Sequence, residues 1–414
     1  MTLPLLTSIL LLLIIAFVLG ELFERYGLPS VVGEILAGLI LGPALLNLIQ
    51  PGATFSAIAE ISLFFIILYI GIEATTDTFR ANFGKSLSFS STSFFIPVIV
   101  MILVSHYVLG LSYFQSIIVS IAIGVPSISI ISVLIKDNGL LHMHTGDVIL
   151  ASVIITDVVA LAITSISIDL KQIYIEVPGI IIFVILLALL DRTLRKHSEF
   201  VVSFFDKIHA MGRGEKIVFG AVIVGGLLVS LIFEEIGVTY VLGAFFAGIL
   251  ISDVVIGEEL NGKIKRTLTR LDDSFFIPLY FSIAGLDVIF PTGQYIVYLV
   301  VLVAISAAVG GVLNYFLSSR TVKEVKPRTV TGILGSKGAV GIIVASLALY
   351  DVGSTSLSRS IDIHLYSVAL FGIMILSLVF ASMVRKSDIR IHNLEEKEIM
   401  LIDGTPMAID TIID

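Results

Sequence analysis

Asp157 lies near the middle of an apolar segment over residues 145–168, and its carboxyl group is the strongest candidate for chemistry in the chain. Thr156 and Ser152 place hydroxyl groups close to it on the same segment. A charged side chain inside membrane hydrocarbon is costly, so an acid in such a place usually marks an ion or proton site. We predict that Asp157, with Thr156 and Ser152, binds an ion and a proton. The alternative is a structural acid that pairs with Lys337 or with hydroxyl groups.

Two other apolar segments, over residues 113–136 and 328–350, are interrupted near their middles by residues that break helices. Proline removes a backbone donor and frees a carbonyl one turn earlier, and glycine tolerates non-helical torsions. Freed carbonyls and serine hydroxyls can bind a small hard cation. In the first interruption, Val125 and Ser127 are predicted to contribute ligands and Pro126 to support the site. In the second, Gly335, Lys337 and Gly338 are predicted to support it.

Lys337 is a second charged residue inside an apolar segment, and two roles remain open for it. It either neutralises the dipoles of the interrupted helices or contacts a bound substrate directly. At a rise of 1.5 Å per residue, Lys337, Asp157 and Pro126 all fall roughly 12 to 18 Å deep in a hydrocarbon core about 30 Å thick. An acid, a cation and a broken helix are therefore expected at one level of the membrane.

The composition itself predicts an all-α polytopic membrane protein. Hydrophobic residues make up 57% of the chain, charged residues 14%, and the mean hydropathy is +1.07. About 13 apolar segments are long enough, or nearly so, to cross a bilayer. They cover residues 3–20, 29–48, 57–75, 87–109, 113–136, 145–168, 174–191, 215–233, 238–252, 270–290, 294–317, 328–350 and 362–384.

The basic residues predict the orientation of these segments. Of the 25 Lys and Arg residues, 22 lie in loops after odd-numbered segments or in the C-terminal tail, and only Lys171 and Arg359 lie after even-numbered ones. Short loops that are rich in Lys and Arg stay on the cytoplasmic side of the membrane. We expect an outside N-terminus, a cytoplasmic C-terminus and a place in the cell membrane.

The chain also repeats itself at a distance of about 210 residues, a pattern typical of inverted-repeat transporters. Residues 31–40 match 241–250, residues 64–69 match 275–280, and Gly124 matches Gly335. A single segment between the halves would place them in opposite directions. We predict two inverted six-helix repeats with two broken crossover helices. The expected parts are a transmembrane domain over 1–385, with repeats at 1–170 and 215–385, a linking helix at 174–191 and a cytoplasmic loop at 192–215, and a short tail at 386–414.

The loop at 192–215 has apolar residues at a helical spacing, which predicts an interfacial helix on the inner leaflet. A pH sensor that uses His197 and His209 is the alternative.

The segment Leu28–Pro43, with the sequence LPSVVGEILAGLILGP, resembles the second-span signature of monovalent cation:proton antiporters, in the branch that holds Kef-type potassium/proton and related sodium/proton exchangers. Gly71 to Glu73, Gly243 to Gly248 and Phe275 to Gly285 are similar to later landmarks of that family, over about residues 1–385. The resemblance implies a homodimer. It also implies one scaffold bundle, and a second bundle of spans four to six and eleven to thirteen that carries the ion.

The resemblance places the cation and proton site on Asp157, next to Thr156 and the break at Val125 to Ser127. Many electrogenic members have a second aspartate where this chain has Thr156, and a lysine where it has Gly311. A single carboxylate carries one charge each way. We therefore expect electroneutral exchange of one monovalent cation (Na⁺, Li⁺ or K⁺, with Na⁺ first) for one proton by alternating access, which would serve pH homeostasis.

Three other functions stay open. A Kef-type potassium/proton antiporter would differ mainly in the size of its cation site, although the tail after Arg385 is too short for the nucleotide-binding domain of Kef-type proteins. An ion-coupled organic-anion symporter or a channel could share the plan of the helices. No enzyme, cofactor or nucleic-acid partner is expected. The chain has no cysteine, so no thiolate metal or redox chemistry is expected. It also lacks a phosphate-binding Gly-x-x-x-x-Gly-Lys-Ser/Thr motif, which disfavours a primary pump.

Overall fold

The computed structural model is all-helical in the part of the chain that it describes. That part comprises residues 3–26, 28–73, 83–128, 131, 134–135, 140, 144–168, 178, 214–235, 239–250, 258–322, 325–350 and 361–384. The predicted linking helix (174–191, residue 178 apart), most of the predicted interfacial helix (192–215) and the tail at 386–414 lie outside the described residues.

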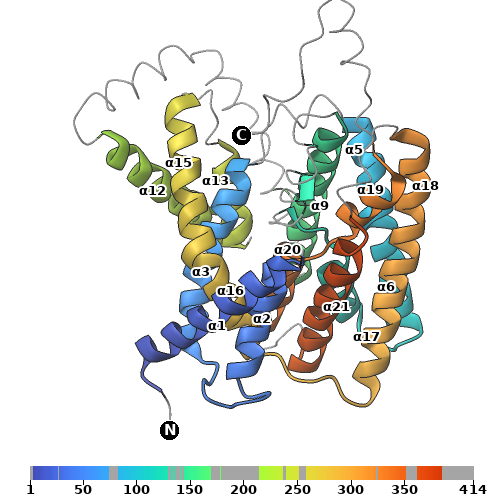
Figure 1. The fold of residues 1–414 in the computed structure, drawn as a ribbon, viewed down its shortest axis with the longest axis horizontal. Helices are drawn as coiled ribbons and strands as arrows, with labels where there is room; N and C mark the ends of the chain where they lie inside the picture. The colour runs from blue at the N-terminus through green and yellow to red at the C-terminus, as the bar shows by residue number, and fades with distance from the viewer. Residues whose placement is uncertain are drawn as a thin grey trace, which may run out of the picture.

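The helices form two bundles that lie side by side in Figure 1. The first bundle contains α1 (Leu5–Arg25), α2 (Ser30–Leu41), α3 (Ala53–Glu73), α12 (Gly214–Glu235), α13 (Tyr240–Leu250), α15 (Glu258–Leu271), the π-helix η3 (Asp272–Phe276) and α16 (Ile277–Leu286). The second contains α5 (Phe83–Ser90), η1 (Ser91–Phe95), α6 (Ile96–Tyr107), α7 (Tyr113–Gly124), α9 (His144–Ile168), α17 (Gln294–Ile305), η4 (Ser306–Gly310), α18 (Gly311–Thr321), α19 (Pro327–Gly335), α20 (Ala339–Tyr350) and α21 (Ile363–Ala381).

The predicted membrane-spanning character is confirmed. Among the described residues, seven helices are long and apolar enough to cross a bilayer, and four shorter helices are also apolar. Every predicted segment except 174–191 overlaps a described helix. One predicted boundary was wrong. The helix α2 ends at Leu41 and not near 48, because Gly42 and Pro43 stop it. The span predicted over 270–290 contains η3 and α16, and the polar helix α15 precedes it.

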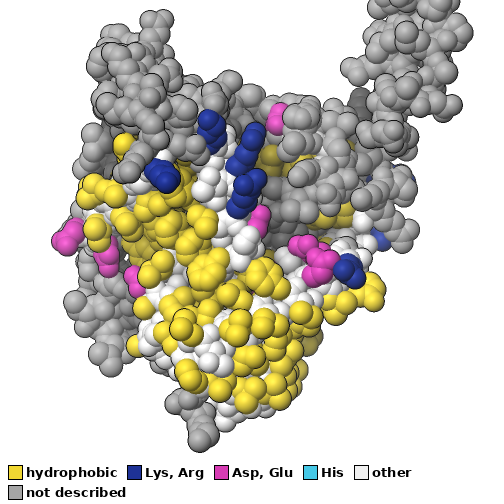
Figure 2. Space-filling model, turned by 60° about the vertical axis from the view of Figure 1, so that its left-hand side comes forward, with side chains coloured by type: hydrophobic (Ala, Val, Ile, Leu, Met, Phe, Trp, Pro, Cys, Tyr) yellow, Lys and Arg dark blue, Asp and Glu magenta, His cyan; other side chains and the backbone are white. Residues whose placement is uncertain are grey.

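Large apolar side chains cover the outside of the first bundle. Leu6, Leu10 and Val18 of α1 and Leu228 and Leu231 of α12 are all more than half exposed. Figure 2 shows a broad hydrophobic surface on this side, bordered by Lys and Arg side chains. A surface of this size must face lipid or another protein.

Glycine pairs let the helices of the first bundle approach closely. A Cβ atom on Gly38 of α2 would overlap the Ser282 carbonyl of α16, and one on Gly248 of α13 would overlap the Leu68 carbonyl of α3. Contacts of this closeness are the reason that small residues gather at helix crossings in membranes. Gly38 and Gly248 hold the same position in the two matched sequences, so equivalent helices make equivalent crossings.

Replacing Gly38 by Ala is expected to destabilise the fold, because α2 and α16 must separate. Overpacking typically costs about 1–3 kcal/mol, and a backbone clash leaves little room to relax. The matched control is Gly225→Ala on α12, where a Cβ meets nothing within 4 Å. That change should be neutral or stabilising, since alanine favours helix. The measurement is the thermal unfolding midpoint in detergent, and equal midpoints for the two variants would contradict the crossing.

Two π-helices lie next to each other in the second bundle. The π-helix η1 separates α5 from α6, and η4 separates α17 from α18. Pro97 follows η1 by two residues, and its missing N–H and its ring explain a widened turn there. Because π-turns often occur at functional sites, the neighbouring helices α7 and α9 are candidates to carry such a site.

Candidate functional site

The two interrupted helices cross at their interruptions. The helix α7 ends at Gly124, Val125 is extended (φ −66°, ψ 125°), and Ser336, which follows α19, is extended in the same way (φ −65°, ψ 128°). The backbone N–H of Ser127 donates to the carbonyl of Ser336 at 3.0 Å, and Pro126 and Lys337 form an isolated antiparallel bridge. Two chain segments far apart in sequence thus expose helix ends to one another within the second bundle.

Lys337 caps the end of α7. Its ammonium group donates to the carbonyl of Gly124 at 2.5 Å, and Ser377 Oγ donates to the Lys337 carbonyl. A cation at a helix C-terminus is stabilised by the partial negative charge of the last carbonyls. This contact corresponds to the first of the two roles predicted for Lys337, that of neutralising a helix dipole.

Glycines allow the tight packing around this crossing. A Cβ on Gly335 would overlap the ring of Phe380 in α21, and one on Gly341 would overlap the carbonyl of Ala122 in α7. The carbonyl of Gly338 accepts from Ile342 at 3.2 Å and so begins the first turn of α20.

Asp157 is almost completely buried in α9, with 1% of its surface exposed. Neither carboxyl oxygen has a hydrogen-bond partner among the described residues, and Lys337 forms no ion pair with it there. The helix α9 packs against α7 and α20, the helices that carry the two breaks. A buried charge without a partner is costly, so this carboxyl is stable only with a proton or a bound cation. The residues present therefore fit a site for either.

The hydroxyl groups of Thr156 and Ser152, on the same helix as Asp157, already donate their protons to backbone carbonyls. Thr156 Oγ1 donates to Val153 O and Ser152 Oγ to Ile149 O, both at 2.7 Å. A hydroxyl that has used its proton keeps lone pairs that can bind a cation. Ser127 Oγ is fully buried and has no partner among the described residues. The break therefore offers an oxygen whose bonding is incomplete.

A comparison with known families decides the class of this protein. The family described as "Sodium/hydrogen exchanger, transmembrane" matches residues 9–386. The chain belongs to this family. The predicted resemblance to monovalent cation:proton antiporters is confirmed, and with it the exchange of sodium for protons as the activity of this sodium/hydrogen exchanger.

Relatives and solved structures agree with this assignment. The chain is 26% identical over 283 residues to the probable Na⁺/H⁺ antiporter 3 of Methanocaldococcus jannaschii, covering 67% of this chain and 70% of that protein. It is 23% identical over 388 residues to a Na⁺/H⁺ antiporter of Enterococcus hirae, covering 90% and 95%. The structure of the sodium proton antiporter MjNhaP1 from M. jannaschii at pH 8 superposes with a TM-score of 0.61 at 13% identity, over 92% of this exchanger and 96% of that chain. That likeness shows a shared fold.

Sequence reasoning missed the serines that hold α9 in place. Ser90 Oγ of α5 donates to the Ser152 carbonyl at 2.8 Å, and Ser86 Oγ donates to the Val148 carbonyl at 3.2 Å. These bonds fix α9 nine and five residues before Asp157. A signal was present, because Ser86 and Ser90 are four residues apart and so share one face of an apolar helix.

Glu34 of α2 is an acid outside the predicted site, and it is buried with 5% exposure. The helices α1 and α16 pack over α2 and remove the carboxyl group from solvent. The side chain of Glu73 lies outside the described residues.

Proposed function

We propose that Na⁺ and H⁺ alternate on the carboxylate of Asp157, and that this competition couples the two fluxes. The observation that carries the proposal is a fully buried acid without a partner among the described residues, on a helix packed against two crossed breaks. A proton and a cation that need the same oxygens exclude each other. Exchange is then obligatory, because the empty carboxylate is too costly to cross the bilayer.

Thr156, Ser152 and Ser127 would complete the cation site with oxygen ligands. Sodium prefers hard oxygen donors, as do other small hard cations. The carbonyl of Val125, at the start of the break, is a further candidate ligand. Pro126, Gly335, Gly338 and Lys337 would act by holding the crossing together, with Lys337 cancelling the partial charge at the end of α7.

We further propose that the second bundle moves against the first, in the manner of alternating access. Each bundle would combine helices from two inverted repeats, at about 1–170 and 215–385, which a linking helix at 174–191 would join. The equivalent glycine crossings at Gly38 and Gly248 support this division. The apolar surface of α1 and α12 offers a face for a homodimer in the cell membrane, with the N-terminus outside and the C-terminus in the cytoplasm.

Electroneutral exchange of one Na⁺ for one H⁺ is the expected stoichiometry, because a second charge is absent at Thr156 and at Gly311. In proteoliposomes with an acid interior, addition of Na⁺ should collapse the pH gradient at a rate that an imposed membrane potential does not change. A rate that follows the potential would contradict the stoichiometry.

The same measurements of the pH gradient test which cation is exchanged. Collapse on addition of Na⁺ or Li⁺, with K⁺ at least about tenfold weaker, is expected for a compact oxygen site. Collapse by K⁺ alone would move the assignment to the potassium/proton alternative. Current without proton counterflow would indicate a channel, and gradient collapse that required an organic anion would indicate a symporter.

A further inference from the structure

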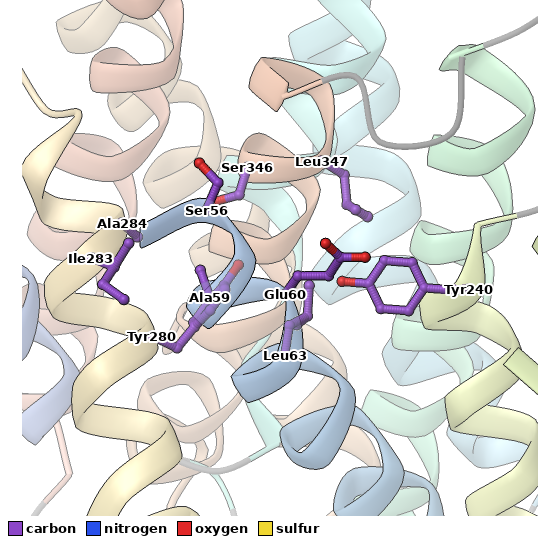
Figure 3. Close-up of a pocket in the computed structure, with 10 residues that line it drawn as sticks. All are labelled: Ser56, Ala59, Glu60, Leu63, Tyr240, Tyr280, Ile283, Ala284, Ser346 and Leu347. Atoms are coloured by element: carbon purple, nitrogen blue, oxygen red, sulfur yellow. The ribbon is translucent and has the colours of Figure 1, made fainter. Parts of the chain in front are cut away.

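A cavity of about 70 Å³ lies between the two bundles, away from the residues assigned above. Figure 3 shows its walls: Glu60 and Leu63 of α3, Tyr240 of α13 and Tyr280 of α16 from the first bundle, and Ser346 and Leu347 of α20 from the second. A water molecule occupies about 30 Å³ in the liquid. The cavity therefore has room for a monovalent cation that keeps part of its water.

The depth of Glu60 makes this cavity unusual. Glu60 lies two turns inside the apolar helix α3, roughly 10 Å from its first residue at 1.5 Å per residue. An ionisable side chain at such a depth normally faces a water-filled space with a functional role. Glu60 is exposed, and the cavity is the space that it borders.

The polar groups of the cavity suit a cation. In Figure 3 the Glu60 carboxyl group points toward the hydroxyl of Tyr240. Glu234, at the end of α12, is close enough to act electrostatically on Glu60 and adds a second negative charge. Tyr280 and Ser346, which also carry hydroxyl groups, are among the residues that line the cavity. A negative site with hydroxyl donors can hold a partly hydrated cation without stripping it.

The wall formed by α20 is tied to the first bundle. Ser346 Oγ lies 3.4 Å from the hydroxyl of Tyr366 in α21, and that hydroxyl donates to the Ala284 carbonyl of α16 at 2.9 Å. A shift of the second bundle against the first would break this chain of bonds and change the cavity. Both α13 and α20, which line the cavity, also pack against α9, the helix of Asp157.

We propose that this cavity is a second cation site, at which Na⁺ binds with part of its water before or after it occupies Asp157. Glu60 lies in the first half of α3, so the site is nearer the end of the molecule at which α3 begins, which is the proposed extracellular side. The inference rests on the proposed function, because it assigns a waiting position on the path of the same ion. Glu60 is its anionic ligand, and Tyr240, Tyr280 and Ser346 supply neutral oxygens.

The test is Glu60→Gln in the full-length exchanger, reconstituted and assayed with Na⁺ added to one side at a time. The apparent KM for Na⁺ on the proposed extracellular side should rise about three- to tenfold, since a local negative site raises the concentration of arriving cations. The maximal rate, and the KM for Na⁺ on the other side, should stay within about twofold. The control is Glu235→Gln, which removes an exposed charge at the same end of α12 without touching the cavity.

An unchanged KM on both sides would overturn the site, as would an equal effect of Glu235→Gln. If Glu60→Gln does not fold, the same KM for Na⁺ is measured in Tyr240→Phe, for which a smaller increase is expected. An unchanged KM in that variant also overturns the site. Failure of this inference is distinct from failure of the proposed function. If Glu60→Gln leaves the KM for Na⁺ unchanged while Asp157→Asn abolishes exchange, only the proposal of a second site is refuted. If Asp157→Asn still exchanges Na⁺ for protons, the proposed role of Asp157 itself is refuted.

Discussion

Asp157→Asn is expected to reduce Na⁺-driven proton flux to the background of empty proteoliposomes. Asparagine keeps the size of the side chain, but it cannot release a proton or offer a negative charge to a cation. The fold should survive, because the wild-type carboxyl makes no hydrogen bond that the change would break among the described residues. The thermal unfolding midpoint should be equal to that of the wild type or higher, since a buried unpaired acid is replaced by a neutral group.

The control for this variant is Asp147→Asn, which makes the same chemical change in the first turn of the same helix. It should retain exchange. A second readout detects binding directly: Na⁺ at about 100 times its dissociation constant should stabilise the wild type by roughly 2.7 kcal/mol, and this stabilisation should vanish in Asp157→Asn. Sodium-dependent stabilisation that persists in the variant would place the cation elsewhere.

Lys337→Met is expected to lower the transport rate about 10- to 100-fold. The change removes the donor to Gly124 O and leaves a buried carbonyl unsatisfied, a loss of about 1–3 kcal/mol. It also leaves the partial negative charge at the end of α7 without its cation, next to a site that must bind and release Na⁺. The initial rate of pH-gradient collapse and the unfolding midpoint measure the two effects separately.

Lys337→Arg serves as the conservative variant, because a guanidinium keeps the charge and the donor. It should recover most of the rate. The surface control is Lys216→Met, at the exposed start of α12, which should be silent. If Lys337→Arg is as inactive as Lys337→Met while both remain folded, then Lys337 contacts the transported ion and its role as a cap is secondary.

Much of the site follows from charge and from helix breakers, which the sequence displays directly. A single acid within an apolar segment is conspicuous because burial of a charge is costly, so Asp157 could be found without any structure. Pro126 and Gly335 predict the two breaks. Proline cannot continue a regular helix, and glycine readily adopts torsions outside it. The structure has both breaks at these residues.

The contacts between helices could not be predicted in the same way. Membrane helices are apolar on all sides, so no hydrophobic period shows which face meets which neighbour. The bond from Lys337 to Gly124, the serine bonds from α5 to α9 and the cavity around Glu60 all depend on that choice. Glu34 shows the same limit, because only the packing of its neighbours shows that it is buried.

The sequence by itself determined the membrane class, the candidate acid and the positions of the two breaks, because each is a local consequence of charge or backbone chemistry. Only the tertiary structure decided that the breaks pair with each other and that Lys337 is engaged at the end of α7 rather than with Asp157. The reason is physical: these arrangements arise from close packing between helices, which small residues such as Gly38 and Gly335 permit but do not specify.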